Sequence, residues 1–113
     1  MITAVAFILA AGVGALARAE AGRRWNRNGG VAVGTLVVNI TGAFLLGLLV
    51  ETAPPAFTVL GTAGLGAYTT FSTFARDTVA LVEQDRVALA GVYVAATLIL
   101  GIGAAAAGVA FTR

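Results

Sequence analysis

The chain has 113 residues, of which 59% are hydrophobic and 11% charged, and its mean hydropathy is +0.97. A bundle of membrane-spanning helices is the simplest interpretation of so apolar a chain. Cysteine and histidine are absent, which excludes disulfides, thiolate metal sites and the usual near-neutral proton shuttle. The net charge is only +2, and no basic face with interleaved aromatic residues points to nucleic acid.

Residues 2–19 form the first predicted membrane span, an apolar run rich in alanine, valine, isoleucine and leucine. A cleaved signal peptide is the alternative, because Ala17 and Ala19 resemble a cleavage site. A signal peptide, however, carries its positive charges before the apolar run. Here Arg18, Arg23 and further arginines end or follow the run, which favours a retained span.

A loop and a second span are predicted next. Residues 20–29 form the loop, in which Trp25 is suited to anchor the chain at the membrane interface and Asn28-Gly29-Gly30 to form a turn. The second span covers residues 30–50, and a short loop containing Pro54-Pro55 ends it.

Two polar side chains lie inside the second predicted span. Thr35 and Asn39 are four residues apart, so they share one face of a helix. Asn39 falls near the middle of the run and hence near the bilayer midplane. Taken singly, Asn39 is equally well explained by a hydrogen bond between helices, which stabilises a bundle by about 0.6–2 kcal/mol.

Residues 56–82 form the third predicted span, and the stretch Gly61–Phe74 (GTAGLGAYTTFSTF) interrupts it with residues that break helices. Irregular backbone at membrane depth survives only where protein buries it or where it lines a cavity. The interruption is therefore a candidate functional site. The fourth predicted span covers residues 87–111, with Tyr93 and Thr97 on one face.

The whole chain, residues 1–113, is interpreted as one all-α membrane subunit with four spans and no second domain. Four short spans leave little room for an enclosed path, so an oligomer with sites at the subunit interface is expected. The first and third loops carry most of the arginines. By the positive-inside rule these loops face the cytoplasm and both termini face outward, in a multi-pass protein of the inner or plasma membrane.

The chemistry available inside the membrane is narrow, because no charged residue lies near the middle of any predicted span. A proton-coupled pump normally needs a carboxylate there. Hydroxyls, an amide and aromatic ring edges can instead replace the water shell of a small anion, and carbonyls freed at a helix end suit a hard cation. The candidate site residues that can do this are Thr35, Asn39, Thr69, Thr70, Phe71, Ser72, Thr73, Phe74, Tyr93 and Thr97.

Each candidate also has a purely structural interpretation. Phe71 and Phe74 taken alone are more often packing residues, and a threonine such as Thr97 often bonds back to its own helix. An arginine at the end of a span more often extends its charge to the membrane interface as an anchor than binds a ligand. Arg18 is therefore expected in a structural role or at a pore vestibule. The set is more informative than its members, because hydroxyls and aromatics gather at an interruption that must be satisfied.

Three strings in the chain carry a family resemblance: GVGALARAEAGR (Gly12–Arg23), GTLVVNITGAFLLGLL (Gly34–Leu49) and GAYTTFSTF (Gly66–Phe74). In this order they resemble the CrcB/Fluc fluoride channel family over nearly the whole chain. The resemblance implies a fluoride-specific channel, not an enzyme, that exports fluoride passively from the cytoplasm and relieves its toxicity. It also implies an antiparallel dimer of four-helix subunits, each with the third helix broken in mid-membrane, and two pores along the interface.

The resemblance further implies roles for particular residues. A central structural sodium ion would be held by the backbone carbonyls of Gly66 and Thr69. Phe71 and Phe74 would turn their ring edges toward fluoride, and Asn39 would be the pore amide. Thr35, Tyr93 and Thr97 match polar positions along the pathway. The sequence departs from the family pattern at Ala67, at Tyr68 and at Gly101, which offers no hydroxyl one turn after Thr97.

Two competing functions and two possible partners remain open at this stage. A small multidrug exporter also has four short spans in a dimer, but it needs a carboxylate within the first span, where this chain has only Glu20 at the end. A purely structural membrane protein would explain the spans but not the clustered hydroxyls and aromatics. The unequal distribution of arginines leaves the partner as either a second copy or a related, oppositely oriented subunit.

Overall fold

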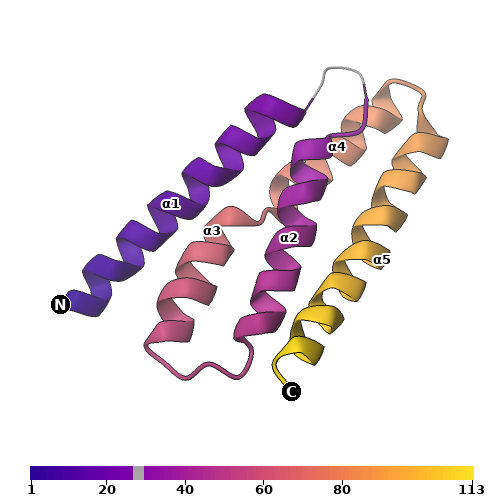
Figure 1. Ribbon diagram of the computed structural model, residues 1–113. Coiled ribbons are helices and arrows are strands. Elements are labelled where there is room, and N and C mark those ends of the chain that lie inside the picture. The colour runs from indigo at the N-terminus through magenta and orange to yellow at the C-terminus, as the bar shows by residue number, and fades with distance from the viewer. Residues whose placement is uncertain (27–29) are drawn as a thin grey trace.

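The computed structural model describes residues 1–26 and 30–113, and this part of the chain is helical with no strand beyond an isolated bridge between Asn26 and Ala32 (Figure 1). The expected all-α class is confirmed. The elements in chain order are α1 (Ile2–Trp25), α2 (Val33–Leu49), the π-helix η1 (Phe57–Leu65), α3 (Gly66–Tyr68), α4 (Phe71–Glu83) and α5 (Val87–Phe111).

The chain runs up and down the long axis of the molecule, and both termini lie at the same end (Figure 1). α2 is central: it packs along α5 on one side and against α1 on the other. α1 and α5 are each long and apolar enough to cross a membrane, whereas α2 is shorter, with 17 residues. The remaining passage along the long axis of the molecule, here called the third crossing, is made by η1, α3 and α4 together.

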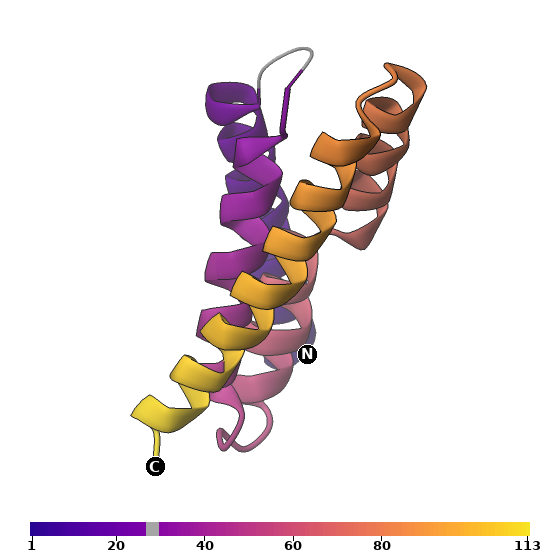
Figure 2. The same ribbon diagram turned by 90° about the vertical axis from the view of Figure 1, so that its right-hand side faces the viewer.

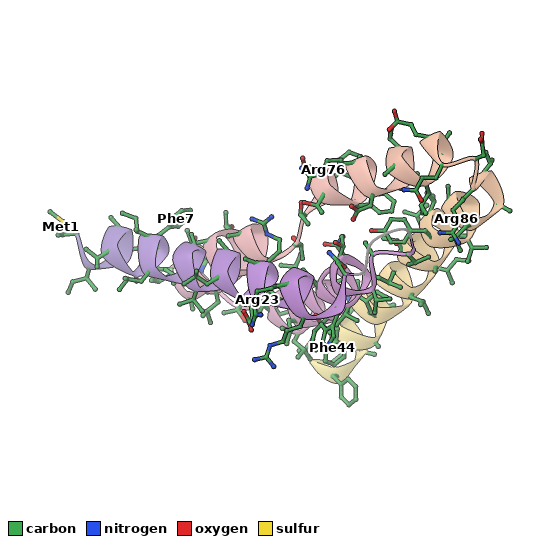
Figure 3. All side chains as sticks on the ribbon, turned by 90° about the horizontal axis from the view of Figure 1, so that it is seen from above. Met1, Phe7, Arg23, Phe44, Arg76 and Arg86 are labelled. Carbon is green, nitrogen blue, oxygen red and sulfur yellow. The ribbon has the colours of Figure 1, made fainter. Side chains whose placement is uncertain are left out.

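This third crossing changes neighbours partway along its length. η1 and α3 pack against α1 and α2, whereas α4 packs against α5 and α2. Figure 2 shows α4 beside one half of α5, and the view in Figure 3 shows α4, which carries Arg76, standing apart from α1. The chain therefore passes over α2 between Tyr68 and Phe71, where no helix is formed.

Glycines allow the helices to approach at distances that a side chain would prevent. A Cβ atom on Gly108 would collide with the carbonyl oxygen of Phe44 and lie 2.9 Å from the backbone nitrogen of Leu48, so this glycine sets the spacing of α2 and α5. A Cβ atom on Gly14 would likewise collide with the carbonyl oxygen of Gly64, where α1 meets η1. Such small-residue contacts are the usual means of packing helices in bilayers.

The buried core is small and lies where α4 meets α5. It contains Leu81 and Tyr93, which are 2% and 1% exposed, and Phe74 packs against it. Most of the large apolar side chains elsewhere are exposed, including Ile8, Leu16, Ile99 and Ile102 at more than 60% each. A water-soluble fold would bury such residues, so the outward-facing apolar surface fits a lipid environment.

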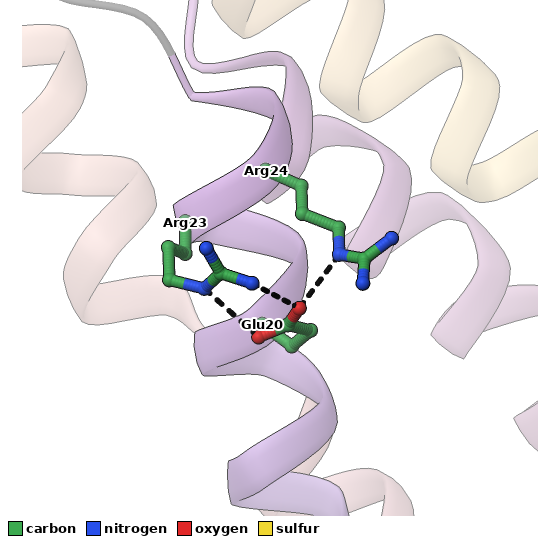
Figure 4. A network of polar contacts seen from close by, with 3 residues as sticks. All are labelled: Glu20, Arg23 and Arg24. Atoms are coloured by element: carbon green, nitrogen blue, oxygen red, sulfur yellow. Dashed lines mark hydrogen bonds and ion pairs between the residues drawn. The ribbon is translucent and has the colours of Figure 1, made fainter.

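The prediction that residues 20–29 form a loop is wrong for residues 20–25, because α1 continues to Trp25. Figure 4 shows the reason: Glu20 accepts hydrogen bonds from Arg23, three residues later, and from Arg24, four residues later, both at 2.6 Å. Pairs at these spacings stabilise a helix, and arginines near its C-terminus are favoured by the helix dipole. Of the turn predicted at 28–30, residues 28 and 29 lie outside the described residues.

The second and third helical regions also differ from the expected bounds. α2 begins at Val33 and not at residue 30, because Asn26 accepts a hydrogen bond from the backbone N–H of Thr35 at 3.1 Å and so caps the helix from outside.

In the third region the glycines of Gly61–Gly66 stay helical, and only Thr69 and Thr70 have extended backbone. The bounds of α5 coincide with residues 87–111.

The α2–α5 contact yields a testable expectation. Gly108→Ala should lower the free energy of unfolding by about 1–3 kcal/mol, because the added methyl group overlaps backbone atoms that cannot turn away. Thermal unfolding in detergent micelles, followed by circular dichroism, measures the change. Gly103→Ala is the matched control, since nothing lies within 4 Å of a Cβ atom there. Equal stability of the two variants would contradict the packing described.

Candidate functional site

The interruption between α3 and α4 consists of two residues with extended backbone. Thr69 has φ −79° and ψ 159°, and Thr70 has φ −151° and ψ 120°. The side chain of Thr70 then caps α4, since its Oγ1 accepts a hydrogen bond from the backbone N–H of Thr73 at 3.1 Å. One helix thus ends at Tyr68 and the next begins at Phe71. The backbone N–H and carbonyl groups that lose their helical hydrogen bonds here need other partners.

Asn39 of α2 supplies two of those partners. Its Oδ1 accepts a hydrogen bond from the backbone N–H of Thr70 at 2.8 Å, and its Nδ2 donates to the carbonyl oxygen of Thr70 at 3.0 Å. In an uninterrupted helix the Thr70 N–H would instead donate to the carbonyl oxygen of Gly66. Asn39 therefore makes the interhelical hydrogen bonds that the sequence offered as one interpretation, and it does so to the backbone of the interruption.

Two further side chains, those of Arg18 and Thr41, form hydrogen bonds with α3 near its end. Arg18 donates from Nε to the carbonyl oxygen of Ala67 at 3.1 Å, in place of the N–H that a continuing helix would bring there. The hydroxyls of Tyr68 and Thr41 lie 2.9 Å apart and share a hydrogen bond, which joins α3 to α2. Arg18 thus has a structural contact, and its cation lies beside a helix C-terminus, where the helix dipole favours positive charge.

An open groove of about 630 Å³ runs beside the interruption. η1 and α5 do not pack against each other, yet both line the groove, so it lies between them over α2. Its lining is mainly apolar with a few polar groups, the usual character of a binding site. The lining residues that bear on the chemistry are Asn39, Thr62, Gly66, Thr69, Thr70, Phe71, Phe74 and Thr97.

The two phenylalanines lie where α4 begins. Their ring centroids are 6.0 Å apart with planes inclined at 53°, and the centroid of Phe74 lies 5.3 Å from that of Tyr93. Phe74 is partly buried against α5, whereas Phe71 is 79% exposed. Nothing within the described chain covers Phe71, so its ring is available to the groove.

The remaining predicted residues have other surroundings. Thr35 is 4% exposed and its Oγ1 accepts a hydrogen bond from Asn26 at 3.2 Å, and the buried Tyr93 hydroxyl donates to Asp77 at 3.3 Å. Ser72 and Thr73 belong to the first turn of α4 and do not line the groove. The structure therefore brings seven of the predicted residues to the groove: Asn39, Gly66, Thr69, Thr70, Phe71, Phe74 and Thr97.

Thr97 lines the groove but uses its proton elsewhere. Its Oγ1 donates to the carbonyl oxygen of Tyr93 at 2.8 Å, one turn earlier on α5. This is the bond back to its own helix that threonine commonly makes in membrane spans. Thr97 can offer only its oxygen lone pairs to a ligand unless that bond breaks.

Three contributing residues were not singled out from the sequence as site residues. Thr62 lies within the interrupted stretch and lines the groove. Tyr68 and Asp77 provide hydrogen-bond partners for Thr41 and Tyr93. For Tyr68, its position beside the interruption was the available signal. The hydrogen bonds of Tyr68 and Asp77 depend on how the helices lie against one another, which spacing along the chain does not encode.

A metal ion at this site would be held by uncharged oxygen atoms, among which main-chain carbonyls are available. The chain has no cysteine or histidine, and the part of it that the structure describes contains no cluster of three or more acidic side chains. Gly66 and Thr69 both line the groove at the C-terminal end of α3, where carbonyl oxygens carry partial negative charge. Such oxygens suit a hard monovalent cation.

The fold and site define a small all-helical membrane protein whose third helical region is interrupted at Thr69 and Thr70. Residues 5–109 match the family described as CrcB-like protein, Camphor Resistance (CrcB). The chain is 38% identical over 122 aligned positions to a protein of Rhodospirillum centenum named fluoride-specific ion channel FluC, with 100% of this chain and 95% of that protein covered. It is 41% identical over 87 positions to fluoride-specific ion channel FluC 1 of Nitrobacter hamburgensis, covering 71% and 69% respectively. This chain belongs to the CrcB family.

The contacts of Asn39 give a second expectation. Asn39→Ala leaves the N–H and carbonyl of Thr70 without their side-chain partners, so the free energy of unfolding should fall by about 2 kcal/mol or more. The midpoint of thermal unfolding in detergent measures the loss. Ser72→Ala, at an exposed position of α4, is the control and should leave the midpoint unchanged. An Asn39→Ala protein as stable as the parent would contradict these contacts.

Proposed function

We propose that this protein is a fluoride-specific ion channel through which fluoride leaves the cytoplasm passively, which relieves fluoride toxicity. The observation that carries the proposal is the groove, in which an interrupted helix, two phenylalanines and several hydroxyls meet in a chain of the CrcB family. It is a channel and not an enzyme, so no residue is assigned a catalytic role.

The chemistry of the groove suits fluoride better than a larger halide. Fluoride is small and strongly hydrated, so a site must offer short, well-placed donors in exchange for its water. The groove offers hydroxyls at the interruption and the exposed ring of Phe71, whose edge carries partial positive charge. Each such partner is individually weak, and weak repeated sites let an ion leave as well as enter.

The working unit is proposed to be an antiparallel dimer with two pores along its interface and the helix interruptions near the bilayer midplane. In one chain the groove is open to one side, is mainly apolar and leaves Phe71 largely exposed. A second subunit laid over it would close the groove and cover that ring. The partner is either a second copy or a related chain of opposite orientation.

A structural sodium ion is proposed at the centre of this dimer, held by the backbone carbonyls of Gly66 and Thr69. One chain supplies too few oxygens for a sodium ion, and a second chain with its interruption against the first would double the donor set. When bound, the sodium would supply a fixed positive charge that lowers the cost of placing anions nearby. The chain's own contribution is to leave these carbonyls without helical hydrogen bonds, because the N–H groups of Thr70 and Thr73 donate instead to Asn39 and to the Thr70 hydroxyl.

The protein is proposed to lie as a multi-pass protein in the inner or plasma membrane. The C-terminal ends of α1 and α4 lie at one end of the molecule, and both termini of the chain lie at the other (Figure 1). The first loop, between α1 and α2, and the third loop, between α4 and α5, carry most of the arginines and are assigned to the cytoplasm. The competing multidrug exporter lacks support, because Glu20 is bound to Arg23 and Arg24.

Fluoride efflux from liposomes containing the purified protein tests the function, and a fluoride-selective electrode measures it. The parent protein should transport fluoride without an energy source. Phe71→Ile and Asn39→Asp should each reduce the flux about tenfold or more, since one removes a polarised ring edge and the other a donor at the interruption. Phe7→Ile, on α1 and away from the groove, is the control. Undiminished transport in both site variants would refute these assignments.

Labelling from the two sides of the membrane tests the antiparallel arrangement. The chain contains no cysteine, so a single Gln84→Cys substitution in the exposed turn after α4 gives one unique label. If two copies of this chain pair in opposite orientations, an impermeant reagent should modify this position from both faces, about half from each. Modification from one face only would exclude the homodimer and leave the related, oppositely oriented partner.

A further inference from the structure

Thr62 is a polar residue of the groove that lies apart from the interruption and from the two phenylalanines. It lies in the middle of η1, is exposed, and lines the groove together with Thr97 and Leu98 of α5. Its neighbours Gly61 and Ala63 are buried, so the helix turns Thr62 toward the open side. A hydroxyl at this position faces whatever occupies the groove.

Most other polar side chains of the groove already use their donors within the protein. Asn39 is bound to the backbone of Thr70 through both its nitrogen and its oxygen. Thr69 donates to the carbonyl oxygen of Leu65 at 3.0 Å, and Thr97 donates to that of Tyr93 at 2.8 Å. Thr69 and Thr97 would have to give up a hydrogen bond before donating a proton to an ion, whereas the Asn39 amide keeps its second N–H.

Two hydroxyls keep a proton to donate. Thr70 accepts from the N–H of Thr73 and retains its own hydrogen. The Thr62 hydroxyl makes no hydrogen bond to any of the residues that the structure describes. Thr69 and Thr97 bond back to the carbonyl four residues earlier, but η1 is a π-helix, whose hydrogen bonds run five residues back and whose carbonyls are therefore placed differently.

We propose that Thr62 is a further fluoride-binding residue, donating its hydroxyl proton to the ion within the groove on the η1 side of the interruption. The inference rests on the proposed channel function and adds a residue to it. Fluoride is a compact, strong hydrogen-bond acceptor, and a hydroxyl that has no competing internal partner can turn its proton to the ion at no structural cost. Together with Thr70 at the interruption, Thr62 gives the ion two successive donors along the wall.

Fluoride efflux from liposomes, measured with the electrode, tests this role in three variants of the full chain. Thr62→Val keeps the shape of the side chain but removes the donor, and should slow efflux about tenfold. Thr62→Ser restores the hydroxyl and should recover most of the parent rate. Thr58→Val is the matched control, because Thr58 is a hydroxyl residue of the same helix that does not line the groove, and its rate should equal that of the parent.

The outcomes separate this proposal from the proposed function. If the parent protein conducts fluoride and Thr62→Val conducts equally fast, the role of Thr62 is overturned and the channel stands. If Thr62→Val loses its dimer on size-exclusion chromatography, Thr62 serves the subunit interface and the proposal is likewise overturned. If the parent protein itself does not conduct, the channel function and this residue's role fail together. Slow efflux from an intact Thr62→Val dimer, with recovery in Thr62→Ser, supports it.

Discussion

One side chain satisfies the backbone where the third crossing leaves its helix. Asn39 binds both the N–H and the carbonyl of Thr70, at 2.8 and 3.0 Å, so two polar groups that would otherwise face an apolar surrounding are paired. An unpaired backbone group at membrane depth costs several kcal/mol. The amide of asparagine is suited to this task because it offers a donor and an acceptor side by side.

The interruption determines how the rest of the molecule is arranged. It lets the third crossing begin against α1 and finish against α5, and the part of α5 that η1 leaves uncovered becomes one wall of the groove. The same step places Phe71 at the start of α4 with its ring exposed and leaves the carbonyls of Gly66 and Thr69 beside the groove. Backbone geometry, hydroxyls and aromatic rings therefore meet at one place because the helix is interrupted there.

The sequence predicted much of this arrangement, and its failures have physical reasons. Apolar runs located all four helical regions, and the extended pair Thr69 and Thr70 lies within the stretch 61–74 in which an interruption was predicted. The end of α1 was misplaced because ion pairs at Glu20 extend the helix past its apolar run. The glycines from Gly61 to Gly66 were expected to break the helix, but they remain helical, and α1 packs closely at Gly64. Which hydroxyls keep a free proton could not be predicted, since that depends on individual backbone contacts.

The measurement that tests this account most directly is the backbone conformation of Thr69 and Thr70 in lipid bilayers. Solid-state NMR of protein labelled with ¹³C at threonine reports it through the Cα and Cβ chemical shifts of each residue. The account predicts extended-backbone shifts at these two residues, with helical shifts at Thr62 and Thr73 in the same spectra. Helical shifts at both Thr69 and Thr70 would mean a continuous third helix and would contradict the account.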